Sequence, residues 1–488
     1  MGVPVLPKDS GVLGKGVLGD MVLGADYTPI TDLTQPYPAH QVVPINIYTT
    51  AMVQCGIVDD YEHLKHVENL YDFDTFEITI NRAKANVAQL IPDRFISFTA
   101  DGREFFGIID SKQVEMDEDG KASSTVRIEA RGVESAFARP CVYGISAGTG
   151  THDTAVTLIP TLTFTFAASD EVVASADCSG SAKVGHYIYN STDDTSTNAV
   201  EITAISSDGL TITLAAAYGG TAGAGKAATL LGEEAETALR RYVDAECISS
   251  AHSACNLPGL SLAATDNKYG GIVVRQVRLD PPLSDLLFGI SREGGVFFRL
   301  VHGTGLAFVF TVYEGTDVSA YVSVTPDLDN AKNLKYYESL LDSKNVLLMG
   351  GSGDDAARLF TYAFTESSEP SAWTRRCKFI DAADLTTEAA LTGRGYELLA
   401  TLEESLTLEV EYLPNPPFTL GTHFDCGDTI RVIFPDEVTE DARITSVTRE
   451  WSISDGKTVM LGIGKEAPDL RSIMKLQRLT TNTAQIKK

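Results

Sequence analysis

Residues that could do chemistry are dispersed along this chain and form no recognisable catalytic motif. The eight histidines include no His-Glu-x-x-His zinc motif. The adjacent carboxylates Asp354 and Asp355 follow a Gly-Ser-Gly turn. A pair of catalytic carboxylates assembled from distant loops, as in glycosidases, leaves no local pattern and stays open. The sequence otherwise predicts no catalytic, no cofactor-binding and no metal-binding residue, and therefore no enzyme and no cofactor.

The cysteines do not indicate a metal site. Their number is odd, and they contain no Cys-x-x-Cys pair, whereas structural zinc sites usually take ligands two to four residues apart. We predict buried free thiols instead. The seven cysteines are Cys55, Cys141, Cys178, Cys247, Cys255, Cys377 and Cys426.

Two short stretches have the composition of ligand-binding loops. Residues 117–120, Asp-Glu-Asp-Gly, lie between two alternating patterns, where Asp-Gly predicts a hairpin turn rather than a calcium loop. The glycine-rich residues 218–226 end in Gly-Lys, but Ala227 stands where a phosphate-binding loop needs Ser or Thr. Neither stretch predicts a bound ligand.

The elements that must position any site are dominated by a repeated β pattern. Residues 427–464 contain a short alternating segment, a long segment, a turn at 454–456 and a closing segment that ends on glycine. Apolar side chains at every second position indicate half-buried strands. Residues 93–132 show the same order of parts. The sequence therefore predicts two similar antiparallel β units.

Length and charge limit the classes of function. At 488 residues the chain is long enough for three or four domains, and 43% hydrophobic residues are enough for packed cores. A net charge of −27 argues against a tight grip on nucleic acid, which needs clustered cations. No apolar run reaches the roughly 20 residues of a membrane-spanning helix, and no secretory signal opens the chain. We expect a soluble protein made in the cytoplasm.

Composition and periodicity divide the chain into six parts. The first carries three Val-Leu-Gly repeats, which predict an arm that docks on a neighbouring subunit. The third is rich in Ala, Thr, Ser and Gly and has only two cations. Periodicity in the later parts predicts helices over 233–248 and 385–402 and a strand over 360–364. The expected parts are an extended arm (1–41), a first β unit (42–145), an inserted all-β domain (146–231), a helix with a small α+β domain (232–330), a second β unit (331–466) and a C-terminal helix or tail (467–488).

The order of these parts resembles the tail-hub proteins of long-tailed, siphovirus-type bacteriophages. The stretches that carry the resemblance include GREFFGIIDSKQ, EEAETALRRYVDAECI, VVRQVRLDPPLSDLLFGISREGG and DCGDTIRVIFPDE. These baseplate hub or tail-tip proteins are similar to the central hub of contractile-tailed phages. The resemblance covers about 40–145 and 232–466, and the 146–231 insert has no counterpart in it.

The resemblance implies a fold and a set of partners. The fold is mainly β with α+β parts, in which two tail-tube-like antiparallel β-barrel domains accompany a small α+β domain and the inserted all-β domain. Three chains form a homotrimer whose six barrels continue a six-fold tail tube. Implied neighbours are a distal tail protein or tube ring, the tape measure protein, and tail fibre or receptor-binding proteins. DNA passes only as cargo, and the implied location is the distal end of the virion tail.

A second class of function remains open, a host-surface carbohydrate-binding or depolymerising protein that acts through the insert. Sugar sites usually need exposed aromatic rings as stacking platforms. The insert contains such rings at i, i+2 spacing in predicted strands, where core packing explains them equally well. These rings are Phe164, Phe166, Tyr187, Tyr189 and Tyr218.

Overall fold

A computed structural model describes residues 42–464 with internal gaps. The predicted arm (1–41) and C-terminal helix (467–488) lie outside the described residues. The gaps are 115–122, 141–151, 154–155, 159–161, 195–197, 251–252, 266–267, 269, 274–275, 278–281, 341–342, 354–357, 365–369, 384–390, 392–394, 396–397, 400–401, 403–404, 415–417, 435–438 and 454–455.

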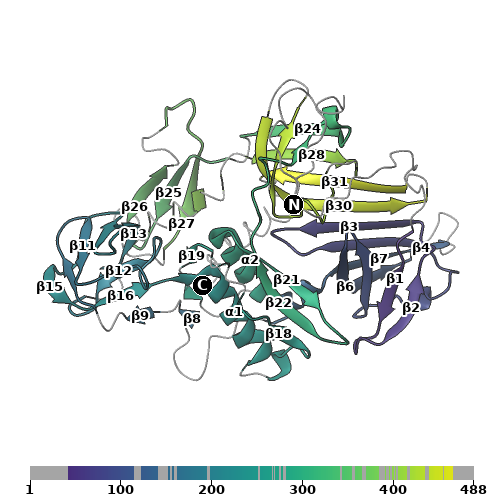
Figure 1. Cartoon of the computed structure of the whole chain (residues 1–488), viewed down its shortest axis with the longest axis horizontal. Coiled ribbons are helices and arrows are strands. Elements are labelled where there is room, and N and C mark those ends of the chain that lie inside the picture. The colour runs from purple at the N-terminus through teal and green to yellow at the C-terminus, as the bar shows by residue number, and fades with distance from the viewer. Residues whose placement is uncertain are drawn as a thin grey trace, which may run out of the picture.

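One large sheet of 13 strands runs through both predicted β units (Figure 1). Its main path has the order β2-β1-β5-β6-β7-β4-β3-β30-β31-β28-β24, and β29 and β23 branch from β30. Its strands are β1 (Ile45–Tyr48), β2 (Gln54–Val58), β3 (His63–Asn69), β4 (Thr75–Asn81), β5 (Phe95–Ala100), β6 (Arg103–Gln113), β7 (Thr125–Gly132), β23 (Ser323–Val324), β24 (Ala331–Ser339), β28 (Ser405–Tyr412), β29 (Thr429–Ile433), β30 (Thr439–Ser452) and β31 (Gly456–Gly464).

The repeat expected from the sequence is visible in the topology. Strands β5, β6 and β7 form an antiparallel meander with a long middle strand, and β29, β30 and β31 form a second one. In both, every second side chain points into an apolar core, as the alternation predicted. The predicted hairpin turns at 117–120 and 454–455 lie outside the described residues.

The two β units are joined edge to edge rather than each closing by its own strands. Among the described strands, β2 pairs only with β1, and β3 pairs with β4 on one side and β30 on the other. The β3–β30 pairing is antiparallel and runs from His63 opposite Ser452 to Asn69 opposite Ser446. In Figure 1 the purple strands of the first unit therefore continue into the yellow strands of the second.

A small α+β region packs beside the large sheet. Helix α1 (Ala235–Val243) and helix α2 (Leu283–Gly294) bury their apolar faces against each other and against a sheet of three strands. That sheet contains β18 (Leu260–Leu262), β22 (Phe308–Tyr313) and β21 (Phe297–His302) in this order. The helix predicted at 233–248 begins two residues later, because residues 233–234 form a strand (β17, Glu233–Glu234) that pairs with β19 (Ile272–Val273). It continues past α1 as a π-helix over Asp244–Ile248.

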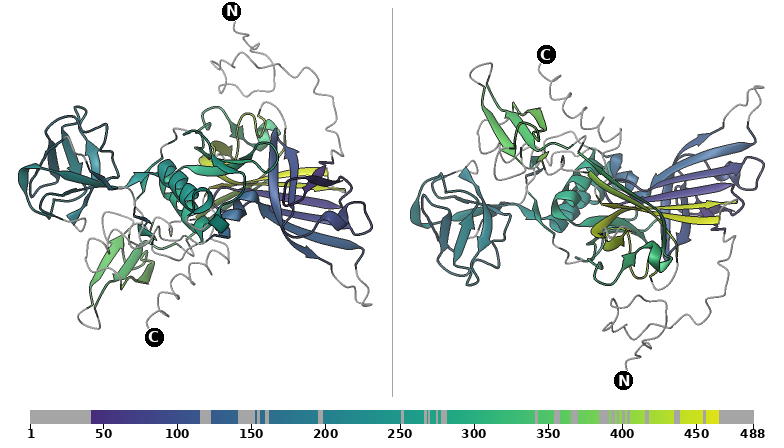
Figure 2. Two further views of the ribbon diagram at one scale, coloured as in Figure 1. Left: turned by 90° about the horizontal axis from the view of Figure 1, so that it is seen from below. Right: turned by 90° about the horizontal axis from the view of Figure 1, so that it is seen from above.

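The insert folds as a separate lobe with its own sheet of eight strands (Figure 2). Its turn at Gly209 adopts a positive φ of 69°, which glycine tolerates without strain. The strands follow the order β15 (Gly223–Lys226), β10 (Phe164–Phe166), β11 (Glu171–Ala174), β14 (Thr211–Leu214), β13 (Val200–Ile205), β12 (Tyr187–Asn190), β16 (Ala228–Leu231) and β9 (Val156–Leu158). A further pair joins β8 (His152–Asp153) to β20 (Gln276–Val277).

A second outlying sheet interrupts the second β unit. Strand β25 (Val346–Gly350) lies between β26 (Phe360–Phe364) and β27 (Cys377–Asp381). One face of this sheet packs with Leu391 and Leu399, which come from the stretch where a helix was predicted at 385–402. Most residues of that predicted helix lie outside the described ones. The observed architecture confirms the mainly β fold with α+β parts, while the exact domain boundaries stay a prediction.

Candidate functional site

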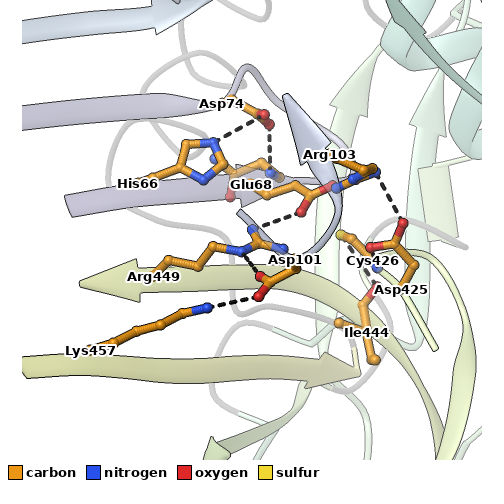
Figure 3. Close-up of polar contacts among 11 residues, drawn as sticks. His66, Glu68, Asp74, Asp101, Arg103, Asp425, Cys426, Ile444, Arg449 and Lys457 are labelled. Atoms are coloured by element: carbon orange, nitrogen blue, oxygen red, sulfur yellow. Dashed lines mark hydrogen bonds and ion pairs between the residues drawn. The ribbon is translucent and has the colours of Figure 1, made fainter. Parts of the chain in front are cut away.

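A cluster of buried charges lies where the two β units meet (Figure 3). At its centre is Arg449 of β30, whose side chain is fully buried. Its Nη1 donates to Glu68 Oε2 of β3 at 2.9 Å, and its Nε donates to Asp101 Oδ2 at 2.6 Å. A single residue of the second unit thus binds two carboxylates of the first.

The carboxylate of Glu68 is shared between two arginines. Besides Arg449, it accepts a hydrogen bond from Arg103 Nη2 of β6. Burial alone would raise the pKa of Glu68, but the charges of Arg103 and Arg449 outweigh it and lower the pKa to about 2. Glu68 therefore stays ionised, and it is held by strands from both units.

Two further ion pairs extend the cluster toward the second unit. Lys457 Nζ of β31 lies 2.7 Å from Asp101 Oδ1. Arg103 Nη1 lies 3.0 Å from Asp425 Oδ2, in the segment before β29. Each of these contacts joins a residue from the first unit to one from the second. Each unit therefore supplies a basic side chain that pairs with a carboxylate of the other unit.

A contact between His66 and Asp74 closes the other side of the cluster. His66 is fully buried, and burial followed by the charge of Arg449 holds its pKa well below the usual range. Its Nε2 lies 3.4 Å from Asp74 Oδ2. Burial, with the nearby charge of Glu68, raises the pKa of Asp74 to about 7. The ring of His66 packs against Phe76 and Phe105 at centroid distances of 4.6 and 4.5 Å.

Another carboxyl group with a raised pKa links this cluster to the α+β region. Glu134, in a short 3-10 helix (Val133–Ala138), accepts a hydrogen bond from Leu300 N of β21 at 2.8 Å. Burial is the main cause that raises the pKa of Glu134 to about 7, with a contribution from the charge of Asp74.

Each unit also places an apolar side chain in the core of the other unit. Trp451 of β30 belongs to the core of the first unit, where its ring meets Phe98 edge-on at 5.4 Å. Leu70, from the segment after β3, belongs to the core of the second unit. Neither core is therefore complete without the other unit.

The geometry of this cluster is that of a structural network. The carboxylates of Glu68, Asp101 and Asp425 each accept from arginine or lysine, and Asp74 accepts from Asn69 N at 3.0 Å and contacts His66. These ion pairs can fix how the two units are aligned, although Arg449 Nη2 and His66 Nδ1 are buried without a hydrogen-bond partner among the described residues. Among the described residues, no group of three or more His, Cys, Asp or Glu is placed to hold a metal ion.

No periodic pattern in the sequence marked this cluster in advance. A sequence signal did exist, since strand β3 carries His66 and Glu68 at the alternating positions where apolar residues are usual. Because these two residues are polar, the strand did not show the usual alternation of apolar residues and was not predicted. The same two polar residues at alternating positions were the available sign of buried charge.

Of the residues singled out in the sequence, Cys426 lies beside the cluster, next to Asp425 (Figure 3), and most of the others have structural roles elsewhere. Cys178, Cys247 and Cys426 are buried thiols, and burial raises the pKa of Cys247 to about 12. The prediction of buried thiols is wrong for Cys377, which is exposed on an edge strand. Cys141 and the pair at 354–355 lie outside the described residues.

In the insert, the glycine-rich stretch and the aromatic rings also serve the fold. Residues 223–226 form an edge strand followed by another strand, and Lys226 Nζ lies 2.7 Å from Asp193 Oδ2. A phosphate-binding loop would need a helix there. Phe164, Phe166 and Tyr218 are buried in the core of the insert. Core packing therefore explains these rings.

Comparisons with known proteins point to one kind of relative. A family model described as Siphovirus ReqiPepy6 Gp37-like protein matches residues 44–143 and 144–465. No curated protein matches the sequence. The solved structures that match include three tail proteins, all of low sequence identity. A tail protein from Neisseria meningitidis MC58 covers 87% of this chain and 96% of its own, at 11% identity and a TM-score of 0.46.

The other two structures are prophage proteins. The 43 kDa tail protein of prophage MuSo2 from Shewanella oneidensis covers 86% of this chain and 98% of its own, at 10% identity and a TM-score of 0.47. The prophage tail protein gp18 from Listeria monocytogenes EGD-e covers 90% of this chain and 99% of its own, at 11% identity and a TM-score of 0.41.

Proposed function

The chain belongs to the Siphovirus ReqiPepy6 Gp37-like family, and from that premise we propose that it is a structural protein of the phage tail, the hub at the tail tip. The family match confirms the resemblance to siphovirus tail-hub proteins that the sequence indicated. In this role the protein continues and closes the tail tube, anchors the components of the tip and forms part of the channel through which the genome leaves.

The observation that carries this proposal is the single sheet through both repeats. A hub must join a six-fold tube to a tip, and three chains with two tube-like units each supply six units. Ion pairs and apolar contacts join the two units into one rigid body. Both units can therefore face their neighbours at a fixed angle. We propose a homotrimer on this basis.

The proposed partners are the distal tail protein or a tube ring on one side and tail fibre or receptor-binding proteins on the other. The tape measure protein would meet the inner surface. A net charge of −27 supports a channel that passes DNA without binding it, since an acidic surface repels phosphates and releases no counterions. No helix in the described part of the chain is long and apolar enough to cross a membrane. The role is non-enzymatic.

The oligomeric state tests the proposal. We expect mass photometry of the purified chain, or of the protein within isolated tails, to show three copies of the 52.4 kDa chain. A dimer, or a ring with six copies of this chain, would remove the basis for the hub, because two repeats per chain match a six-fold tube only in a trimer.

A further inference from the structure

Helix α1 ends in an unusual turn that contains a buried cysteine. The helix continues into the π-helix Asp244–Ile248, which closes where Ser249 N donates to Asp244 O at 2.7 Å. Turns of this type are rare and are found most often at functional sites. The turn places Cys247 in the core of the α+β region, with its side chain fully buried. The fold therefore fixes the position of this thiol.

A second cysteine returns to the same turn. Cys255 lies in a short 3-10 helix (Ser253–Cys255) that contacts the π-helix. Leu257 N donates to Cys247 O at 2.8 Å, and a backbone bond of this kind brings the two Cα atoms to about 5–6 Å from each other. The chain between the two cysteines is thus a short loop that is closed at its base, and Cys255 lies two residues from that base.

The two thiols act on each other and have no competing partner. Burial, the charge of Glu246 and the charge of a deprotonated Cys255 raise the pKa of Cys247 to about 12. In the described part of the chain, neither sulfur has a hydrogen bond. Cys178 Sγ and Cys426 Sγ, in contrast, each donate to a backbone carbonyl, at 3.1 and 3.9 Å. Both thiols of the loop are therefore available to react with each other.

The two cysteines differ in how they can be reached from solvent. Cys255 is partly exposed, whereas Cys247 is buried. A thiolate is the nucleophile in thiol–disulfide exchange, so the buried thiol with a raised pKa is a poor first nucleophile. An oxidant in solution therefore meets Cys255 first.

We propose that Cys247 and Cys255 form a disulfide bond when the folded protein meets a small disulfide such as oxidised glutathione. The thiolate of Cys255 attacks one sulfur of the oxidant, which forms a mixed disulfide and releases one glutathione. The thiolate of Cys247 then attacks Cys255 Sγ, so that the protein disulfide forms and the second glutathione leaves. Two protons and two electrons pass from the cysteines to oxidised glutathione, which becomes two thiols.

The bond ties the π-helix to a segment that contacts the first β unit. Leu257 packs against the core built around α1 and α2, and also against the core that contains Met52 and Phe106 of the first unit. Cysteines stay reduced in the bacterial cytoplasm and are oxidised outside the cell. The cross-link therefore fastens the α+β region to the first unit after the protein has left the host. The inference rests on the placement of two thiols and does not depend on the hub role.

Peptide mapping of the native full-length protein tests the disulfide. The protein is incubated with oxidised glutathione, blocked with N-ethylmaleimide, digested with trypsin without reductant and analysed by mass spectrometry. Both cysteines lie in one tryptic peptide, residues 242–268. We expect this peptide to lack two hydrogen atoms and to carry no maleimide, and to take up two maleimides once it has been reduced.

Two single variants separate the steps of the reaction. Cys247→Ser should leave Cys255 as a mixed disulfide with glutathione, because the second thiol is missing. Cys255→Ser should leave Cys247 unmodified, because the oxidant does not reach a buried thiol. If the parent peptide keeps glutathione on Cys255 without closing, the two sulfurs do not meet. A peptide that stays fully reduced, or a bond from Cys255 to a cysteine of another peptide, also overturns the proposal.

Hydrogen exchange tests the consequence for the loop. The amide of Leu257, which closes the loop on Cys247 O, should exchange about tenfold more slowly in the oxidised protein than in the reduced protein. Equal exchange in the two forms would show that the disulfide does not fasten this segment.

Discussion

The junction between the repeats and the core of the insert are both buried, but the junction contains charged side chains and the core of the insert contains apolar ones. All 13 residues of the insert's core come from 164–230, and none is charged. The junction instead buries Arg449 between Glu68 and Asp101, and it borrows Trp451 for the first unit's core. The insert is complete by itself, whereas each repeat is completed by the other.

The difference shows what each region must specify. An apolar core stabilises but tolerates repacking, while buried ion pairs add little net stability and accept few alternative alignments. A shift of one residue between β3 and β30 would turn Arg449 to the opposite face and leave the buried Glu68 with Arg103 alone. We infer that the charges fix the register of the two repeats, which a continuous tube wall requires and a projecting lobe does not.

The largest effect is expected from Arg449→Ala. Removing the guanidinium leaves Glu68 and Asp101 with one basic partner each in a buried site, a change that typically costs about 3–5 kcal/mol of unfolding free energy. Urea unfolding measures it through the fluorescence of Trp451, which becomes the sole tryptophan in a Trp373→Phe background.

Arg431→Ala is the matched control for that change. Arg431 lies in the same repeat, and it binds Asp441 through two hydrogen bonds of 2.7 and 2.8 Å at the surface. Exposed pairs of this kind contribute about 0–1 kcal/mol. Equal losses in the two variants would show that burial of the charge at the junction is not what distinguishes it.

The same contrast explains what the sequence could predict. Strands such as β4, β7 and β31 alternate apolar and polar residues, so the repeat and its strands were predictable from the period of two. Strand β3 was not, because His66 and Glu68 occupy buried positions that depend on polar partners elsewhere, among them Arg449, some 380 residues away. A pattern within one strand contains no information on such a distant partner.

The exposed aromatic rings on β26 were not predicted, for a different reason. Residues 360–364 were predicted as a strand, but a strand pattern does not tell which of its two faces the rest of the chain will cover. In the insert, rings at the same i, i+2 spacing, Phe164 and Phe166, are buried. At β26, Phe360 and Tyr362 stay exposed because the core of that sheet forms on its other side.

The pH dependence of stability should distinguish the junction from the insert, with a smaller change in unfolding free energy. The pKa values of Asp74 and Glu134 are raised to about 7, so the folded chain binds more protons than the unfolded chain between about pH 4 and 7. The contribution of these two groups to stability therefore falls as pH rises through that window, whereas the lowered pKa of His66 acts with the opposite sign below about pH 6.5. The lowered pKa of Glu68, about 2, has the opposite sign, and its contribution is lost as pH falls below about 4.

The double variant Asp74→Asn, Glu134→Gln tests this assignment. Both amides keep the shape of the neutral acids, so the decline in unfolding free energy between about pH 4 and 7 should flatten. Urea midpoints of the Trp451 transition at several pH values measure the slope. A slope equal to that of the parent protein would show that these two carboxyl groups do not titrate as the structure implies.

The smallest effect on the junction is expected from removing the insert. Deletion of 148–229, bridged by a short Gly/Ser linker, removes 12 of the 13 residues of the insert's core, all but Leu230, and none of the residues that build the junction. The deletion also removes the β8–β20 pair, which consists of two residues on each strand. Because the insert's apolar contacts are internal, the Trp451 transition and the oligomeric state should match those of the full chain. Mass photometry and urea unfolding of the deleted chain measure both.

An insoluble or monomeric product would mean that the insert supports the rest of the molecule. The contrast between a self-contained lobe and mutually dependent repeats would then not hold.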